Sequence, residues 1–152
     1  ELDKLCYDHI VNVQSAIPAK VGYKGYEKTI CSSVNQVICH GIPNNEKFLK
    51  DGDILNIDVT VIKDGWHGDT SKMFLVGKCA PHNQRLVQIT QECLYKGIEA
   101  VKPGADAAAE GNVIKRSAVP GLPKRADGVV ASDLTTRCVC QSGTTGKRER
   151  TR

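Results

Sequence analysis

The sequence is poor in aromatic residues and contains no long apolar run. Its 152 residues include one Trp, four Tyr and two Phe, and all seven lie before residue 96. No apolar segment approaches the ~20 residues that a helix needs to cross a bilayer, so we expect no membrane partner. The chain opens with the charged stretch Glu1-Leu-Asp-Lys and not with a secretory leader, which favours a cytoplasmic protein.

Regular cysteine spacing and two common catalytic motifs are also missing. The seven cysteines form no framework, and we interpret them as reduced thiols in a reducing compartment. Cys138 and Cys140 have no later Cys or His that could complete a zinc site. The sequence has neither a phosphate-binding glycine loop with its Lys nor a Gly-x-Ser-x-Gly turn, which argues against the enzymes that use them.

The charge is unevenly distributed along the chain. Residues 1–110 hold 12 Lys or Arg and 14 Asp or Glu, whereas residues 111–152 hold 9 and 3. The net charge of +4 therefore comes from the C-terminal segment, which has no aromatic residue and no sustained periodicity. Such a composition predicts a disordered or poorly packed basic tail. An arm for RNA is the alternative, although it lacks the aromatic side chains that stack on single strands.

With 40% hydrophobic and 25% charged residues, the chain suits one globular domain with a modest core. Residues 2–15 are expected to form a helix, residues 29–39 a strand, and residues 83–101 the most regular helix of the chain. Lys102-Pro-Gly is expected to end that last helix. The apolar residues of the first helix that should face the core are Leu5, Ile10 and Val13.

The most informative segment runs from residue 53 to residue 74. Asp64-Gly65 lies between two β-rich runs and predicts a two-residue hairpin turn, because both residues tolerate positive φ. Cross-strand partners share a face, so Asp58 and Asp69 should lie on one side of the hairpin, on a diagonal with Cβ atoms roughly 7 Å apart. A one-residue bulge would separate them onto opposite faces. The expected pairs are Lys63 with Trp66, Thr60 with Asp69, and Asp58 with Ser71.

The alternation of the first run supports this register. Two carboxylates so close together repel each other unless a cation or a proton lies between them. A hard divalent metal ion is the natural occupant, although a surface hairpin with solvated acids would show the same pattern. The apolar face comprises Leu55, Ile57, Val59 and Val61, and the polar face comprises Asn56, Asp58 and Thr60.

His40 is the histidine with the strongest local signal. It precedes the rigid turn Gly41-Ile-Pro43, which could direct the imidazole into a cleft. A surface or turn role is the simpler interpretation. A Cys–His nucleophile with Cys39 is disfavoured, because adjacent residues of a strand point to opposite faces. His67 is expected to face solvent.

Three long blocks resemble the type I methionine aminopeptidases of the bacterial kind. They are CSSVNQVICHGIP at residues 31–43, LKDGDILNIDVTV at residues 49–61 and DGWHGDTSKMF at residues 64–74. The resemblance runs from Glu1 to about Asn112. It implies an α/β (α+β) domain, part of a pita-bread fold with an antiparallel sheet and flanking helices. Residues 1–112 would form the N-terminal half of the catalytic domain, and residues 113–152 would be an unmatched basic tail.

The resemblance also implies roles for individual residues. The family removes N-terminal methionine from nascent proteins, using two divalent metal ions (Co, Mn, Fe, Zn or Ni) that activate a water molecule. Asp58 resembles the aspartate that chelates one metal ion, and Asp69 resembles the one that bridges both. His40 is similar to the histidine that contacts the substrate. Tyr23, Tyr26 and Cys31 match the methionine side-chain pocket, and Asn35 and Val37 match a monovalent-cation site.

The family's other metal ligands, a histidine and two glutamates, have no counterpart after Val113. No His follows His82, and the only carboxylates after Val113 are those of Asp127, Asp133 and Glu149. A truncated gene, a shifted reading frame or a genuine tail would each give this pattern. We therefore expect weak metal binding and little or no catalysis by this chain.

Two other functions remain open. One is a non-catalytic binding protein of the same fold. The other is a basic-tailed module associated with RNA or the ribosome. Proximity to the ribosome would also suit an enzyme acting on nascent chains, but no specific nucleic acid is expected as its partner.

Overall fold

The computed structural model describes residues 1–104, which fall into two compact units. The first unit contains Glu1–Gly77, and the second begins at Lys78. Helix α1 (Leu2–Asp8) and the π-helical turn η1 (His9–Val13) precede the short strand β1 (Ile17–Pro18) and the 3-10 turn η2 (Tyr23–Gly25). Strands β2 (Ile30–Val34), β3 (Ile54–Lys63) and β4 (Trp66–Leu75) and helix α2 (Pro81–Ala100) follow. The expected class, an antiparallel sheet with helices, is confirmed.

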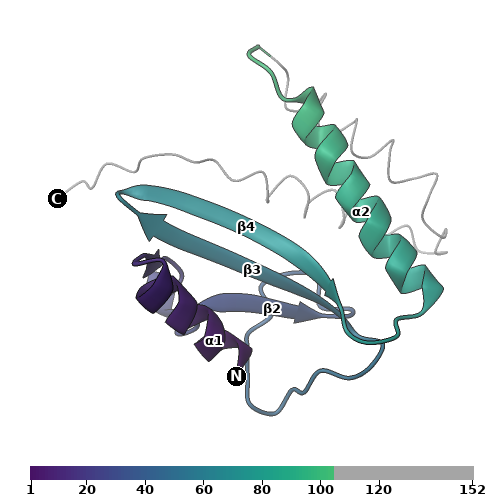
Figure 1. Cartoon of the computed structure of the whole chain (residues 1–152), viewed down its shortest axis with the longest axis horizontal. Helices are drawn as coiled ribbons and strands as arrows, with labels where there is room; N and C mark the ends of the chain where they lie inside the picture. Colours follow the sequence, from purple (N-terminus) through teal and green to yellow (C-terminus); the bar gives the residue numbers. More distant parts are fainter. Residues whose placement is uncertain (105–152) are drawn as a thin grey trace. The chain divides into compact units, whose positions relative to one another are not determined.

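Strands β3 and β4 form a regular hairpin around a two-residue turn (Figure 1). Asp64 has a φ of 51° and Gly65 a φ of 82°, the left-handed conformations that a type I′ turn requires at both positions. The register is continuous over ten pairs, with no bulge. The three pairs predicted from the sequence, Lys63 with Trp66, Thr60 with Asp69 and Asp58 with Ser71, are all confirmed.

Strand β3 is the centre of the sheet, because β1 and β2 share its edge opposite β4. Pro18 of β1 pairs with Val61, and Ile30 of β2 pairs with Val59. The chain between Pro18 and Ile30 therefore leaves the sheet edge and returns to it at neighbouring positions of β3. This arrangement brings both ends of the excursion close to Asp58.

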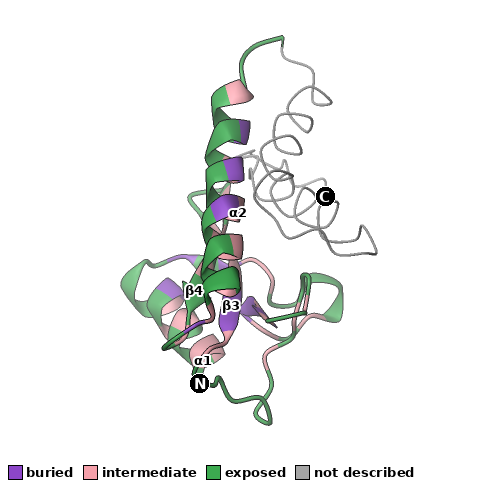
Figure 2. Cartoon of the chain, turned by 90° about the vertical axis from the view of Figure 1, so that its right-hand side faces the viewer, coloured by how far each residue is buried: buried purple, intermediate pink, exposed green. Residues whose placement is uncertain are grey.

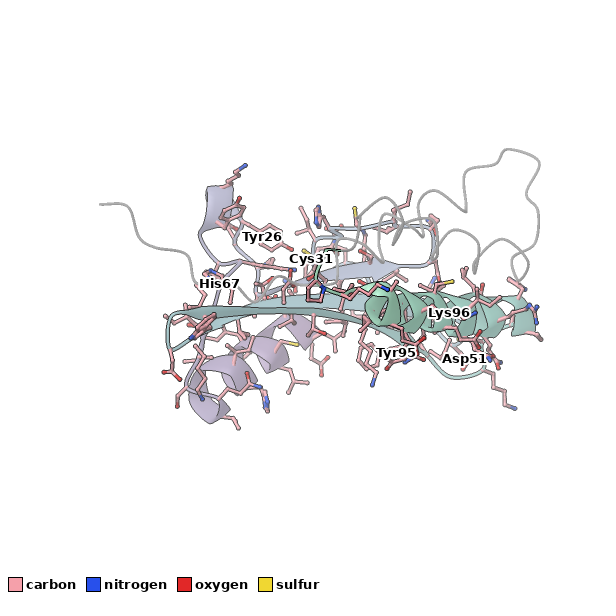
Figure 3. All side chains as sticks on the ribbon, turned by 90° about the horizontal axis from the view of Figure 1, so that it is seen from above. Tyr26, Cys31, Asp51, His67, Tyr95 and Lys96 are labelled. Carbon is pink, nitrogen blue, oxygen red and sulfur yellow. The ribbon has the colours of Figure 1, made fainter. Side chains whose placement is uncertain are left out.

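The two faces of the sheet differ in what covers them. Figure 3 shows α1 on one side of the sheet and the labelled side chains of Tyr26 and Cys31 on the other. Asp3 at the start of α1 accepts hydrogen bonds from the backbone N–H groups of Thr29 (2.7 Å) and Ile30 (3.1 Å), which fixes the helix against β2. On the apolar face, Leu55 and Ile30 are buried, whereas Ile57, Val59 and Val61 are half-buried.

The first helix differs from the prediction in which residues it buries. Ile10 is 4% exposed, but Leu5 and Val13 are 66% and 69% exposed, so the expectation that all three face the core was wrong. The helix is α-helical only to Asp8, and η1 continues it with wider π-helical turns, as in the bond from Gln14 N–H to the His9 carbonyl (3.0 Å). Leu5 and Ile10 are five residues apart, about 140° around an α-helix, so the helix cannot bury both on one side.

Strand β2 is shorter than the expected strand over residues 29–39. It ends at Val34, because Asn35 takes a φ of 50° and turns the chain. The Asn35 amide Nδ2 donates to Asp53 Oδ1 (2.8 Å), and its Oδ1 accepts from Ile54 N–H (3.0 Å). These bonds attach the end of β2 to the start of β3.

Helix α2 begins at Pro81, a residue suited to a first turn because its missing N–H would have no partner there. It ends at Ala100, so the predicted helix over residues 83–101 is confirmed within two residues at each end. Its buried residues, Ile89, Cys93 and Gly97, recur every four positions and lie along one side of the helix (Figure 2). No helix among residues 1–104 is both long and apolar enough to cross a membrane. The predicted basic tail lies outside the described residues.

Gly41 packs directly against the free edge of β2. Its carbonyl accepts from Ser32 N–H (2.7 Å), its own N–H donates to Ser33 Oγ (3.2 Å), and a Cβ there would overlap the Ser32 carbonyl oxygen. We expect Gly41→Ala to lower the free energy of unfolding by about 1–3 kcal/mol, because the backbone must move to relieve the overlap.

Urea unfolding followed by circular dichroism checks this expectation. Gly68→Ala is the matched control, because a methyl group at Gly68 would meet only Val61 Cγ2, at an ordinary 3.6 Å. It should leave stability unchanged or raise it by up to about 1 kcal/mol. Equal losses in the two variants would contradict the close approach of Gly41 to β2.

Candidate metal centre

Two carboxylates lie on the polar face of the β3–β4 hairpin. Asp58 pairs with Ser71, and Asp69 pairs with Thr60, two residues further along β3. Side chains two residues apart on a strand share a face, and so do cross-strand partners. Asp58 and Asp69 are therefore diagonal neighbours on one side of the sheet, as the sequence predicted.

The surroundings of the two carboxylates differ. Asp69 is exposed, and its Oδ1 accepts a hydrogen bond from Thr60 Oγ1 (2.9 Å). Asp58 is half-buried in the middle of β3, between Cys31 on β2 and Ser71 on β4. Two such groups can act as hard oxygen donors, one open to solvent and one enclosed.

Lys20 is the closest charged neighbour of Asp58. Its Nζ donates to Asp58 Oδ1 (2.5 Å) and to the Asp58 carbonyl (3.0 Å), and it lies 3.6 Å from Cys31 Sγ. The ion pair is shielded, since the two side chains are only 17% and 24% exposed. In this state the positive charge beside Asp58 is the Lys20 ammonium.

Tyr26 and Cys31 line the same side of the sheet (Figure 3). The Tyr26 hydroxyl donates to the Ile30 carbonyl (2.8 Å) and lies 3.5 Å from the buried Cys31 Sγ. Burial and, next, the contact with Cys31 raise the pKa of the Tyr26 phenol, so it remains protonated at neutral pH. Cys31 pairs with Asp58 in the sheet, which connects this proposed pocket wall to the carboxylates.

Uncharged polar side chains extend along the face of the sheet that carries Asp58 and Asp69. Ser71 Oγ donates to Asn56 Oδ1 (2.9 Å), and Asn56 Nδ2 lies 3.4 Å from Met73 Sδ. His67 is also on this side of the sheet (Figure 3). Its Nδ1 is buried without a hydrogen-bond partner, so the expectation that His67 simply faces solvent was wrong for that atom. In the sheet His67 lies opposite Ile62, which pairs with Ile17 on its other side.

The remaining sequence-predicted residues lie in loops around the sheet. His40 is exposed, with a φ of 54°, immediately before the Gly41 contact with β2. Tyr23 is 58% exposed, and the Lys24 ammonium lies over its ring, 5.6 Å from the centroid. The structure thus brings Tyr26 and Cys31 together with Asp58, while Tyr23 and His40 occupy open positions.

Asn35 and Val37, the residues that resemble a monovalent-cation site, belong to the turn after β2. The side chain of Asn35 is held by Asp53 and Ile54, and its hydrogen bond is the main reason that the pKa of the Asp53 carboxyl is lowered. Val37 N–H donates to the Val34 carbonyl (3.1 Å). Both residues therefore support the bend that leads towards β3.

The donor set fits part of a divalent-metal site. Carboxylate oxygens are the ligands that hard divalent ions prefer, and Asp58 and Asp69 present them on one face. Such ions take about six donors, and residues 1–104 contain no cluster of three or more His, Cys, Asp or Glu side chains that could hold one. The described residues therefore supply two ligands, one of which is bonded to Lys20.

No local pattern of the chain indicates a role for Lys20. Its position follows from the pairing of β1 with β3, which joins residues far apart in the chain, and from the bond between Ala19 N–H and the Thr60 carbonyl (2.9 Å). Strand β1 comprises only Ile17 and Pro18. A local pattern of two residues is too short to indicate a strand.

Comparison with known proteins identifies relatives of this chain. The sequence matches metallopeptidase family M24 over residues 1–138. It is 58% identical to methionine aminopeptidase of Escherichia coli over 116 residues, 76% of this chain and 44% of that protein. The structure resembles the crystal structure of methionine aminopeptidase from Rickettsia prowazekii, with a TM-score of 0.75 and 52% identity over 78% of this chain and 47% of that one.

A second crystal structure, methionine aminopeptidase from Thermotoga maritima, aligns with a TM-score of 0.69 and 32% identity over 74% of this chain and 47% of that one. These likenesses confirm the expected pita-bread architecture. The chain spans less than half the length of each of these three relatives. Its family match covers most of its own length and includes every residue of the carboxylate face described above. The chain therefore belongs to metallopeptidase family M24.

Proposed function

We propose that this chain carries the two-aspartate part of a metal-dependent aminopeptidase that removes N-terminal methionine from nascent proteins. One observation supports the proposal above all others. The ten-residue register of the β3–β4 hairpin sets Asp58 and Asp69 as diagonal neighbours on one face. Two neighbouring carboxylates repel each other unless a cation or a proton lies between them. Membership of a metallopeptidase family supports a metal ion as that cation.

In this proposal Asp58 would be a ligand of one of two divalent ions, and Asp69 would be a ligand of both. Bound at this position, the ions would polarise the scissile carbonyl and activate the attacking water. Thr60 orients Asp69 through its hydroxyl, because that group donates to the carboxylate at 2.9 Å. The paired strands keep both aspartates in place before any ion arrives.

Tyr26 and Cys31 would form the wall that receives the methionine side chain, with Tyr23 closing it from the loop. A buried thiol beside an aromatic ring offers the soft, apolar contact that a thioether favours. The Tyr26 hydroxyl is engaged with the Ile30 carbonyl, so it orients the ring. His40 would contact the substrate from the exposed loop after β2. Asn35 and Val37 would support a monovalent cation at the bend between β2 and β3.

Metal binding gives the first test of this proposal. Because the described residues offer two carboxylates, we expect the full chain to bind Mn²⁺ weakly, with a dissociation constant of about 10⁻⁴–10⁻³ M. Asp69→Asn should raise that constant at least about tenfold, since it removes one of the two charged ligands. Electron paramagnetic resonance of free Mn²⁺ during a titration measures both values.

Asp64→Asn is the matched control for Asp69→Asn. It makes the same chemical change in the same hairpin, and Asn-Gly is itself a favoured sequence for this type of turn. Its affinity for Mn²⁺ should equal that of the unaltered chain. Equal weakening by both substitutions would show that the ion is attracted by general negative charge, and the proposed centre would then be abandoned.

Catalysis is tested by restoring the missing ligands. We expect the chain alone to release methionine from Met-Ala-Ser very slowly or not at all with Mn²⁺ or Co²⁺. A fusion of residues 1–112 to the C-terminal half of Escherichia coli methionine aminopeptidase should hydrolyse the tripeptide, because the resemblance places the other ligands in that half. Liquid chromatography of free methionine measures the rate.

Three variants of the fusion complete this test. Asp58→Asn and Asp69→Asn should each lower its rate by at least about a hundredfold, whereas Asp64→Asn should not. A folded fusion without activity, tested beside the active parent enzyme, would refute the aminopeptidase function. It would favour a non-catalytic binding protein of the same fold.

A further inference from the structure

The Lys20–Asp58 ion pair is more extensive than a surface contact. The ammonium makes two hydrogen bonds to one residue, at 2.5 Å to the carboxylate and at 3.0 Å to the carbonyl, and a third contact at 3.6 Å to Cys31 Sγ. Both side chains are largely shielded from solvent. Shielded pairs are weakened less by salt than exposed pairs are.

The pairing of β1 with β3 places Lys20 beside Asp58. Pro18 pairs with Val61, and the next residue donates its N–H to the Thr60 carbonyl, so the backbone follows the edge of β3 as far as Lys20. The chain returns at Ile30, opposite Val59, with Cys31 opposite Asp58. The ammonium is therefore held between two segments that are both anchored to β3, and it cannot simply swing away as a lysine on an open surface could.

The position of Lys20 affects any ion that binds Asp58. A divalent cation must either displace the ammonium from Oδ1 or bind the other oxygen with a positive charge in contact with the same carboxylate. The first route breaks a charged hydrogen bond, and the second adds repulsion between like charges. Both routes lower the affinity for the ion.

We propose that Lys20 is a tethered counter-cation that holds Asp58 when no metal is bound and competes with the metal for it. This inference rests on the proposed role of Asp58 as a metal ligand. Lys20 is a positioning residue in this scheme, because it acts through Asp58. In its absence the half-buried Asp58 would face Asp69 without compensation, so Lys20 also stabilises the metal-free hairpin.

A Mn²⁺ titration of the full chain tests the competition. Lys20→Met should lower the dissociation constant for Mn²⁺ about tenfold, which corresponds to about 1.4 kcal/mol. Lys20→Gln, which keeps a hydrogen-bond donor and removes the charge, should tighten binding in the same direction and serves as a second variant where Lys20→Met does not fold. Lys20→Arg keeps the charge and should bind as weakly as the unaltered chain.

Two controls separate competition at Asp58 from a change in net charge. Lys47→Met removes the same charge from an exposed loop and keeps the hydrogen bond from the Lys47 backbone N–H to Asn44 Oδ1 (2.9 Å), so it should leave the affinity unchanged. In an Asp58→Asn background, Lys20→Met should have no further effect, because the carboxylate for which lysine and metal compete is gone.

Thermal melting provides a readout that does not depend on activity. Metal-free Lys20→Met should melt at a lower temperature than the unaltered chain. Saturating Mn²⁺ should raise the melting temperature of Lys20→Met by more than it raises that of the unaltered chain. If folded Lys20→Met and Lys20→Gln bind Mn²⁺ no more tightly than the unaltered chain, the inference falls while the proposed function stands. If neither the unaltered chain nor the Lys20 variants bind Mn²⁺ at millimolar concentration, both fall.

Discussion

A two-residue turn sets the positions of the two carboxylates on the sheet. Asp64 and Gly65 both take positive φ, and this bend matches the twist of the strands that it joins. A shift of one residue in the register would transfer every side chain of β4 to the other face. Asp69 would then point towards the side that carries α1, and Asp58 would lose its partner. The carboxylate pair is thus a consequence of backbone conformation at the tip of the hairpin.

The second organising feature is the way that β1 and β2 share one edge of β3. Because both strands pair with the same edge, the loop between them begins and ends beside Asp58. The loop supplies Lys20 at one end and Tyr26 near the other, and β2 adds the buried Cys31. The half-buried Asp58, the Lys20 ammonium and the contact between Tyr26 and Cys31 therefore meet because residues 17–34 pair twice with β3. Family membership assigns a metallopeptidase context to this arrangement.

Local patterns predicted those parts of the structure whose information is local. The turn residues and the alternation of β3 predicted the hairpin and its register, and helical spacing predicted α2 within two residues at each end. The contact of Lys20 with Asp58 depends on the pairing of β1 with β3, which no local pattern indicates. The burial of His67 Nδ1 and the exposure of Leu5 likewise depend on how segments distant in the chain pack, which no local pattern specifies.

Anomalous diffraction from a crystal of this chain soaked in Mn²⁺ tests the central claim most directly. The claim is that the hairpin holds two carboxylates close enough to share a cation. It predicts a manganese peak bounded by Asp58 and Asp69, with oxygen distances of about 2.0–2.3 Å and the Lys20 ammonium moved from Asp58 Oδ1. Carboxylates on opposite faces of the sheet, or manganese bound only at other acidic residues, would contradict it.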